Sequence, residues 1–176
     1  NIPASKFKYA INNKLPDDIA ILNSEEVDEN FHSRYNCLGK RYIYNILNRE
    51  SPSPIMRNYT YHYKHKLNID DMNEGCKYIL GKHDFSAFKS SASNVKDSVR
   101  VIEDIRVITQ GDFVTIQVTG NGFLYNMVRI IVGTLLDVGI GKKSPIDIKY
   151  IIESKDRNKA GKTVPAQGLY LDKVFY

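Results

Sequence analysis

The chain has 176 residues, of which 42% are hydrophobic, and its formal net charge is +5. This length and apolar fraction predict a single domain over residues 1–176 with a real hydrophobic core. Two cysteines, Cys37 and Cys76, in no metal-binding spacing, exclude a disulfide framework or zinc site, and no apolar run reaches membrane-spanning length. We therefore expect a cytoplasmic protein whose mild basic charge is either the ordinary excess of a globular domain or a signal for an anionic partner such as nucleic acid.

The first half of the chain switches between helical and strand-like periodicity. Two segments with apolar side chains on one helical face predict helices: 3–14 and 68–80. Three segments rich in β-forming residues predict strands: 19–27, 40–47 (KRYIYNIL) and 59–64 (YTYHYK). Asn68 is placed to cap the second helix and Gly81 to end it.

The second half begins with a polar, serine-rich loop over residues 89–98. Two alternating segments around the turn TQGD predict a hairpin: 99–108 and 113–118. An apolar helix is predicted over 124–136. Another helix is predicted to start with Ser144 as its cap and Pro145 at its first helical position. The last eight residues, LYLDKVFY, alternate as a closing strand.

The order of these elements indicates the fold class. Strands and helices mix without the regular alternation that a parallel sheet requires. We therefore predict an α+β fold, with a mostly antiparallel sheet and helices packed on one face.

Arg129 is a single charge near the middle of the apolar stretch 122–139. A buried guanidinium is costly unless a polar partner meets it. The arginine either snorkels to the surface or pairs with a scaffold group, or it holds a catalytic carboxylate or a phosphate. Tyr125 lies one turn earlier on the same face, and Gly133, one turn later, permits close backbone approach.

The stretch 31–44 interleaves cations with tyrosines. Cations can hold phosphates while an aromatic ring stacks on a base, which is typical of RNA recognition. A surface strand with solvated charges and core tyrosines would give the same pattern. The four histidines are dispersed, so we predict no metal site.

Six stretches in order carry a resemblance to a known family: LPDDIAI, FHSRYNCLGKRYIYNI, HDFSAF, GFLYNMVRIIVGTLLDVG, SKDRNKAG and PAQGLYL. Together they cover essentially the whole chain and resemble the TruA-type tRNA pseudouridine synthases. The resemblance implies an isomerase that detaches a uracil in the anticodon stem-loop of tRNA, turns it and rejoins it to the ribose through carbon. It also implies a pseudouridine-synthase-like fold, a homodimer, and no cofactor or metal.

The catalytic aspartate of that family lies in a segment reading roughly Gly-Arg-Thr-Asp-Ala-Gly-Val-His, upstream of the stretch that matches the start of this chain. No aspartate here matches the catalytic position. We therefore expect the chain to be the C-terminal portion of a synthase, without the N-terminal domain that carries the nucleophile, and inactive on its own. A non-catalytic RNA-binding module and a structural or dimerisation domain are the alternative functions.

The resemblance assigns roles to residues of this chain. Arg129 matches the arginine that pairs with the nucleophilic aspartate, and Tyr42 matches the tyrosine that stacks on the target uracil. Leu169 matches an apolar residue near the base. Arg34 and Arg41 are weaker candidates, for RNA phosphate or for the local scaffold. The chain departs from the family at Lys89, where arginine is common, and lysine cannot make the same bidentate phosphate contact.

Overall fold

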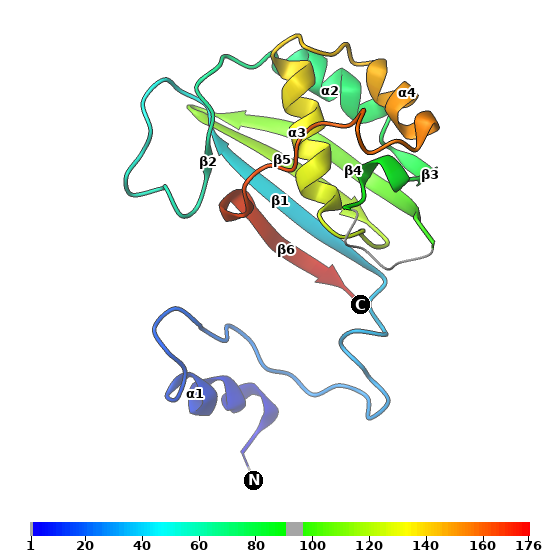
Figure 1. The fold of residues 1–176 in the computed structure, drawn as a ribbon. Helices are drawn as coiled ribbons and strands as arrows, with labels where there is room; N and C mark the ends of the chain where they lie inside the picture. The colour runs from blue at the N-terminus through cyan, green and yellow to red at the C-terminus, as the bar shows by residue number, and fades with distance from the viewer. Residues whose placement is uncertain (1, 91–96) are drawn as a thin grey trace. The chain divides into compact units, whose positions relative to one another are not determined.

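The computed structural model describes residues 2–90 and 97–176, shown in Figure 1. The chain divides into two units, Asn1–Asn36 and Cys37–Tyr176, which are considered separately below. Most of the loop predicted over residues 89–98 lies outside the described residues.

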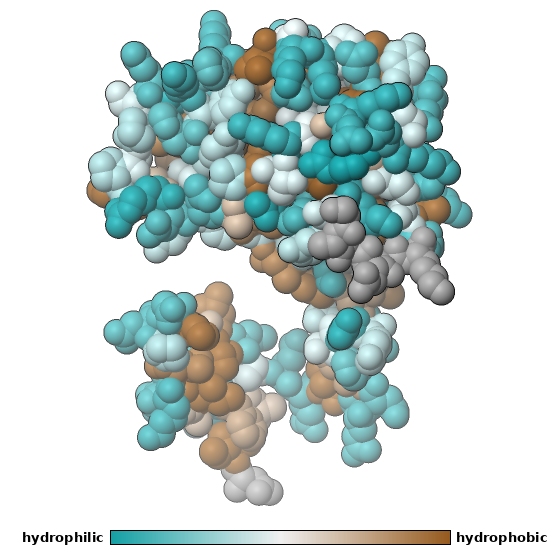
Figure 2. Space-filling view, in the orientation of Figure 1, coloured by the Kyte–Doolittle hydropathy of each residue, from teal (hydrophilic) through white to brown (hydrophobic). Residues whose placement is uncertain are grey.

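The first unit holds the short 3₁₀ turn η1 (Ala4–Lys6) and the helix α1 (Phe7–Asn12), which confirms the first predicted helix. The strand predicted over 19–27 is wrong, because this segment forms no ladder with any strand of the described residues. The Asn12 side chain donates to Ile21 O at 2.9 Å and accepts from Ile21 N at 2.8 Å. A side-chain amide thus takes the place that a neighbouring strand would occupy. Figure 2 shows apolar side chains gathered on the surface of this unit.

The second unit is built on a mixed sheet that is mostly antiparallel. Its strands are β1 (Gly39–Leu47), β2 (Tyr61–His62), β3 (Gly81–Asp84), β4 (Val99–Gln110), β5 (Phe113–Gly120) and β6 (Leu169–Phe175). The order is β2-β1-β5-β4-β3, and β6 pairs with β1. Only the β1–β2 pair is parallel. The predicted hairpin and the closing strand are confirmed, whereas β2 is shorter than predicted and β3 was not foreseen.

Three helices cover one face of this sheet, as Figure 1 shows: α2 (Ile69–Lys77), α3 (Met127–Gly139) and α4 (Asp147–Ser154). The 3₁₀ turns η2 (Ser86–Phe88) and η3 (Ala166–Gly168) lie in the connections. Side chains at alternate strand positions, including the fully buried Tyr44, Ile46, Ile116 and Val118, pack under α3 and α2 to form the core. The predicted α+β fold with helices on one face is confirmed.

Of the two helix caps predicted from the sequence, one forms and the other does not. The Asn68 side chain accepts hydrogen bonds from Asp70 N and Asp71 N, so the predicted cap of α2 is confirmed. The cap predicted at Ser144 is wrong, because α4 starts at Asp147. The Ser144 side chain caps nothing there; instead, the Asp147 carboxylate accepts a hydrogen bond from Ser144 N at 2.7 Å.

The segment 160–164 crosses α3 at a point where a glycine of the segment, Gly161, meets a glycine of the helix, Gly133. A Cβ built on Gly133 would overlap the carbonyl oxygen of Lys162, and one on Gly161 would overlap the backbone of Gly133. The crossing is also tied by Gly161 N, which donates to Thr134 Oγ1 at 2.9 Å. This approach brings residues 162–164 against the first turns of α3.

We predict that Gly133→Ala destabilises the protein, although alanine normally favours a helix. The new methyl group has no space beside Lys162, and overpacking of this kind costs about 1–3 kcal/mol. The midpoint of thermal unfolding should fall by roughly 2–4 °C for each kcal/mol. Gly122→Ala is the control, because its Cβ would meet the Arg100 side chain at an ordinary 3.5 Å. Equal midpoints for the two variants would show that the segment can move aside freely.

Candidate active site

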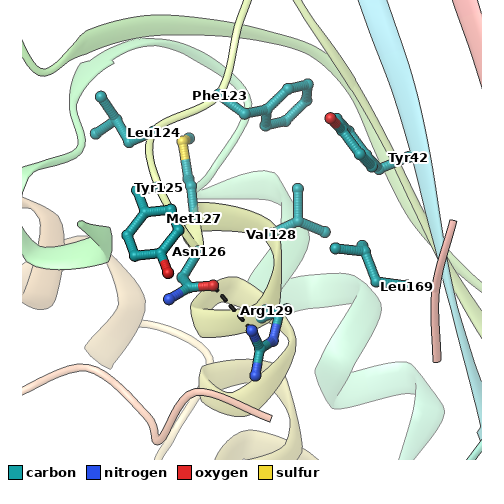
Figure 3. Close-up of a pocket in the computed structure, with 9 residues that line it drawn as sticks. All are labelled: Tyr42, Phe123, Leu124, Tyr125, Asn126, Met127, Val128, Arg129 and Leu169. Atoms are coloured by element: carbon teal, nitrogen blue, oxygen red, sulfur yellow. Dashed lines mark hydrogen bonds between the residues drawn. The ribbon is translucent and has the colours of Figure 1, made fainter. Parts of the chain in front are cut away.

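A pocket of about 240 Å³ lies where the β5–α3 connection meets β1 and β6 (Figure 3). Its lining comes from three parts of the chain that are far apart in sequence: Tyr42, Leu169 and the continuous run Phe123, Leu124, Tyr125, Asn126, Met127, Val128 and Arg129. The sheet supplies one wall and the start of α3 supplies the other. Three of the five predicted site residues, Arg129, Tyr42 and Leu169, therefore meet in one cavity.

Asn126 forms the sharp entry into α3. Its backbone is left-handed, with φ of 61°, a conformation that asparagine tolerates better than most residues. This turn ends the loop and explains why α3 begins at Met127 rather than at the predicted Leu124. It also directs the Asn126 side chain toward the next turn, where Oδ1 accepts a hydrogen bond from Arg129 Nη1 at 2.9 Å.

Arg129 is half-buried and is held by two neutral groups. Its Nε donates to Val164 O at 2.7 Å, in addition to the bond from Nη1 to Asn126. Among the described residues no carboxylate lies within ion-pair distance of the guanidinium. Two of its five N–H donors are thus engaged, which orients the group and leaves three donors for an anionic partner.

The opposite wall is aromatic and apolar. The rings of Tyr42 and Phe123 meet edge to face, with centroids 5.2 Å apart. Burial, with a smaller contribution from Cys37, raises the pKa of the Tyr42 hydroxyl, so this phenol stays neutral at physiological pH. Leu169 and Val128 line the pocket beside it. The wall can receive a flat, uncharged ring.

Tyr44 is the next residue after Tyr42 on the same face of β1. It anchors the segment that carries Leu169. Its hydroxyl donates to Pro165 O at 2.6 Å, and Gly168 packs so closely on its ring that a Cβ there would lie 2.9 Å from it. Burial raises the pKa of Tyr44, and the nearby Arg129 charge offsets only part of that rise. The buried tyrosine therefore fixes the start of β6 relative to α3.

Arg41 and Arg34 do not line this pocket. Because successive strand residues face opposite ways, Arg41 lies on the other face of β1 from Tyr42, where its Nε pairs with Asp172 of β6 at 2.7 Å. Arg34 belongs to the first unit, and its guanidinium lies 5.9 Å from the ring centroid of Tyr35. Their predicted RNA contacts stay predictions.

Two residues that line the pocket, Phe123 and Asn126, had no predicted role. Asparagine tolerates a left-handed turn better than most residues, which is a weak signal in the sequence, because just before a helix it more often marks a cap with an extended backbone. The edge-to-face contact of Phe123 with β1 had no such signal, because it depends on how the loop is placed in space. Lys89, where the chain departs from the family's common arginine, follows η2 outside the pocket lining.

No cluster of three or more histidine, cysteine, aspartate or glutamate residues suited to a metal occurs within residues 2–90 and 97–176. None of the helices in those ranges has the length and apolar character needed to cross a bilayer.

Comparison with known proteins identifies the family. A family model described as tRNA pseudouridine synthase matches residues 76–176. The tRNA pseudouridine synthase A 2 of Clostridium perfringens is 58% identical over 176 residues, which is 100% of this chain and 72% of the relative. The tRNA pseudouridine synthase A of Clostridium acetobutylicum is 57% identical over 175 residues, and that of Acetivibrio thermocellus is 53% identical, each covering 99% of this chain and 72% of the relative.

The α+β fold and a base-sized pocket with one oriented cation agree with a base-modifying isomerase. The match over the full chain then shows that it belongs to the tRNA pseudouridine synthase family. The segment that carries Tyr42 lies outside the family-model match but inside the match to each of these relatives.

We predict that Asn126→Leu is less stable than Asn126→Gly by about 1–2 kcal/mol. Glycine adopts the left-handed backbone freely, and leucine does not. Both variants lose the side-chain bond to Arg129, so a difference in their thermal midpoints reports the backbone alone. If the leucine variant unfolds at the same temperature as the glycine variant, the left-handed turn does not constrain α3.

Proposed function

We propose that this chain forms the uridine-binding side of a synthase that isomerises uridine to pseudouridine in the anticodon stem-loop of tRNA. The observation that carries the proposal is the meeting of Tyr42, Arg129 and Leu169 in one pocket, although they come from β1, α3 and β6. At about 240 Å³ the pocket is smaller than the sites of drug-sized ligands, roughly 300–1,000 Å³, and suits a single extruded base.

Arg129 acts in this proposal as the partner of an aspartate nucleophile. A carboxylate inside a closed pocket must stay ionised to attack, and a cation beside it favours the ionised form. The bonds to Asn126 and Val164 fix the guanidinium before the carboxylate arrives, so little orientation is lost on pairing. The aspartate comes from the family's Gly-Arg-Thr-Asp segment, because no described residue places a carboxylate there.

Tyr42 and Leu169 receive the uracil. Extruding a base from a stacked loop costs a few kcal/mol, and an aromatic platform recovers about 1–3 kcal/mol of that cost. The edge of Phe123 holds the Tyr42 ring in place, and Leu169 closes the pocket on the apolar side. The neutral phenol adds no charge that would repel the nucleophile.

The proposal has three further parts: the enzyme acts as a homodimer, needs no cofactor and works in the cytoplasm. The first two rest on the family resemblance, and the third rests on the cysteine usage of the chain. The basic net charge of +5 supports an RNA substrate, because cations that neutralise phosphates release bound counterions.

We predict that Arg129→Lys, in the enzyme expressed from its natural gene, still folds and binds tRNA but forms pseudouridine about 100-fold more slowly. Lysine keeps the charge and loses the planar fork that binds Asn126 and Val164 together. Arg129→Met should lower turnover at least as much. It should also cost about 1–3 kcal/mol of stability, because the Val164 carbonyl loses its donor.

Turnover, tRNA affinity and the thermal midpoint are measured together for the two Arg129 variants. Normal turnover in either one, or loss of folding in Arg129→Lys, would make Arg129 a scaffold residue only.

We predict that Tyr42→Phe binds tRNA nearly as well as the wild-type enzyme, because the ring is retained. Tyr42→Ala should lose about 1–3 kcal/mol of base interaction. Because truncation also removes the contact with Phe123, the thermal midpoint is measured beside the single-turnover rate and Kd. The same Kd and rate in all three proteins would exclude stacking of the uracil on Tyr42.

A further inference from the structure

A second hollow of about 350 Å³ is formed by β2, the residues that follow it and Lys162 of the segment 160–164. We call it the Tyr61 groove, and it is lined by Tyr61, His62, Tyr63, Lys64, His65 and Lys162. All but Lys162 come from β2 and the residues that follow it. They make up most of the YTYHYK stretch, which the proposed chemistry does not use.

The rings of the Tyr61 groove form a row. The ring centroids of Tyr61 and Tyr63 are 5.8 Å apart, and those of Tyr63 and His65 are 5.7 Å apart. The Asn48 side chain donates to Tyr63 O at 2.8 Å and to His65 O at 2.7 Å, which fixes the backbone under these rings. The row is therefore a built aromatic surface rather than a loose loop.

Two exposed lysines, Lys64 and Lys162, add positive charge on the rim of the groove. Among the described residues neither has a carboxylate within ion-pair distance. Asp137 lies near Tyr63, whose pKa is raised by burial first and then by Tyr61 and Asp137. The Asp137 carboxylate is itself paired with lysines on its own side of α3, so the groove keeps a net positive charge.

A comparable hollow between α2 and α4 lacks this character. Its lysines, Lys77 and Lys149, pair with Glu74 and Glu153, and Glu153 also lines it. Positive charge without a protein partner, next to a row of rings, thus distinguishes the Tyr61 groove.

One short segment of the chain borders both the groove and the candidate active site. Lys162 lines the groove and packs its carbonyl on Gly133, while Val164, two residues on, holds Arg129. The two hollows therefore border the same short segment, which is the arrangement that a polymer occupying both would need.

We propose that the Tyr61 groove binds the ribose-phosphate backbone of the RNA beside the target uridine. Lys64 and Lys162 contact phosphates, and the exposed ring of His65 stacks on an unpaired base. Cations that follow a backbone, interleaved with rings that accept any base, are how proteins hold single-stranded RNA segments. This inference rests on the proposed function, since RNA is the ligand of both sites.

The test uses the enzyme expressed from its natural gene and a synthetic anticodon stem-loop hairpin. Lys64→Gln/Lys162→Gln is compared with Lys82→Gln/Lys159→Gln, which removes the same charge from exposed lysines outside the groove. Kd is measured by fluorescence anisotropy over a series of salt concentrations. The groove variant should bind about ten-fold more weakly. The slope of its log Kd against log salt concentration should be smaller by about 0.7–0.9 for each lysine removed. The control should keep the wild-type slope.

Equal slopes for the groove variant and the wild type would overturn the proposal, as would equal losses in the groove and control variants. A second arm tests the ring: His65→Ala should weaken binding of the hairpin at least about five-fold and leave a blunt RNA duplex unaffected. Equal loss on hairpin and duplex would remove the base contact from the proposal. Pseudouridine formation by the wild-type enzyme is scored separately, so its absence overturns the proposed function even where the groove result holds.

Discussion

The glycine-to-glycine crossing of α3 by the segment 160–164 is the contact on which the rest of the larger unit depends. The two glycines allow the two backbone segments to touch. This contact fixes the position of Val164 without depending on flexible side chains. Val164 then orients Arg129, and the same segment leads into η3 and β6, which delivers Leu169. One close approach thus positions both the Arg129 guanidinium of α3 and the apolar Leu169 of β6.

Arg129 joins two interpretations that the sequence had left as alternatives. It is a scaffold residue, because it ties the start of α3 to a loop carbonyl, and it also faces a pocket with donors unused. The two roles support each other physically. A cation that is already oriented by neutral partners keeps its charge available, whereas a carboxylate in the scaffold would have neutralised it.

Much of the fold was readable because hydrophobic periodicity reports burial. The β4–β5 hairpin, α2 with its Asn68 cap and β6 were all predicted from local patterns. The segment 19–27 failed because alternation shows that a strand would fit but supplies no partner, and here an asparagine side chain takes that place. The late start of α3 depended on one left-handed residue, Asn126, which periodicity does not register.

The site residues also divide into those that were predicted and those that were missed. Arg129, Tyr42 and Leu169 were named from the resemblance, since no local pattern relates a strand, a helix and a closing strand. Phe123 was missed because its contact with Tyr42 is purely tertiary. Conversely, the pattern of cations and tyrosines in residues 31–44 does not describe a single surface: Arg41 and Tyr42 face opposite sides of β1, which is what strand alternation dictates.

The pairing of β1 with β6 has a consequence for how the molecule is made. Arg41 and Asp172, which face each other across these strands, are 131 positions apart. During synthesis at about 5–20 residues per second, β1 leaves the ribosome many seconds before its neighbour exists. In that interval one edge of β1 has no β6 to cover its N–H and C=O groups, and such an edge can pair with another chain. Until the last strand has been made, this edge of β1 is therefore a part of the fold that is open to misassembly.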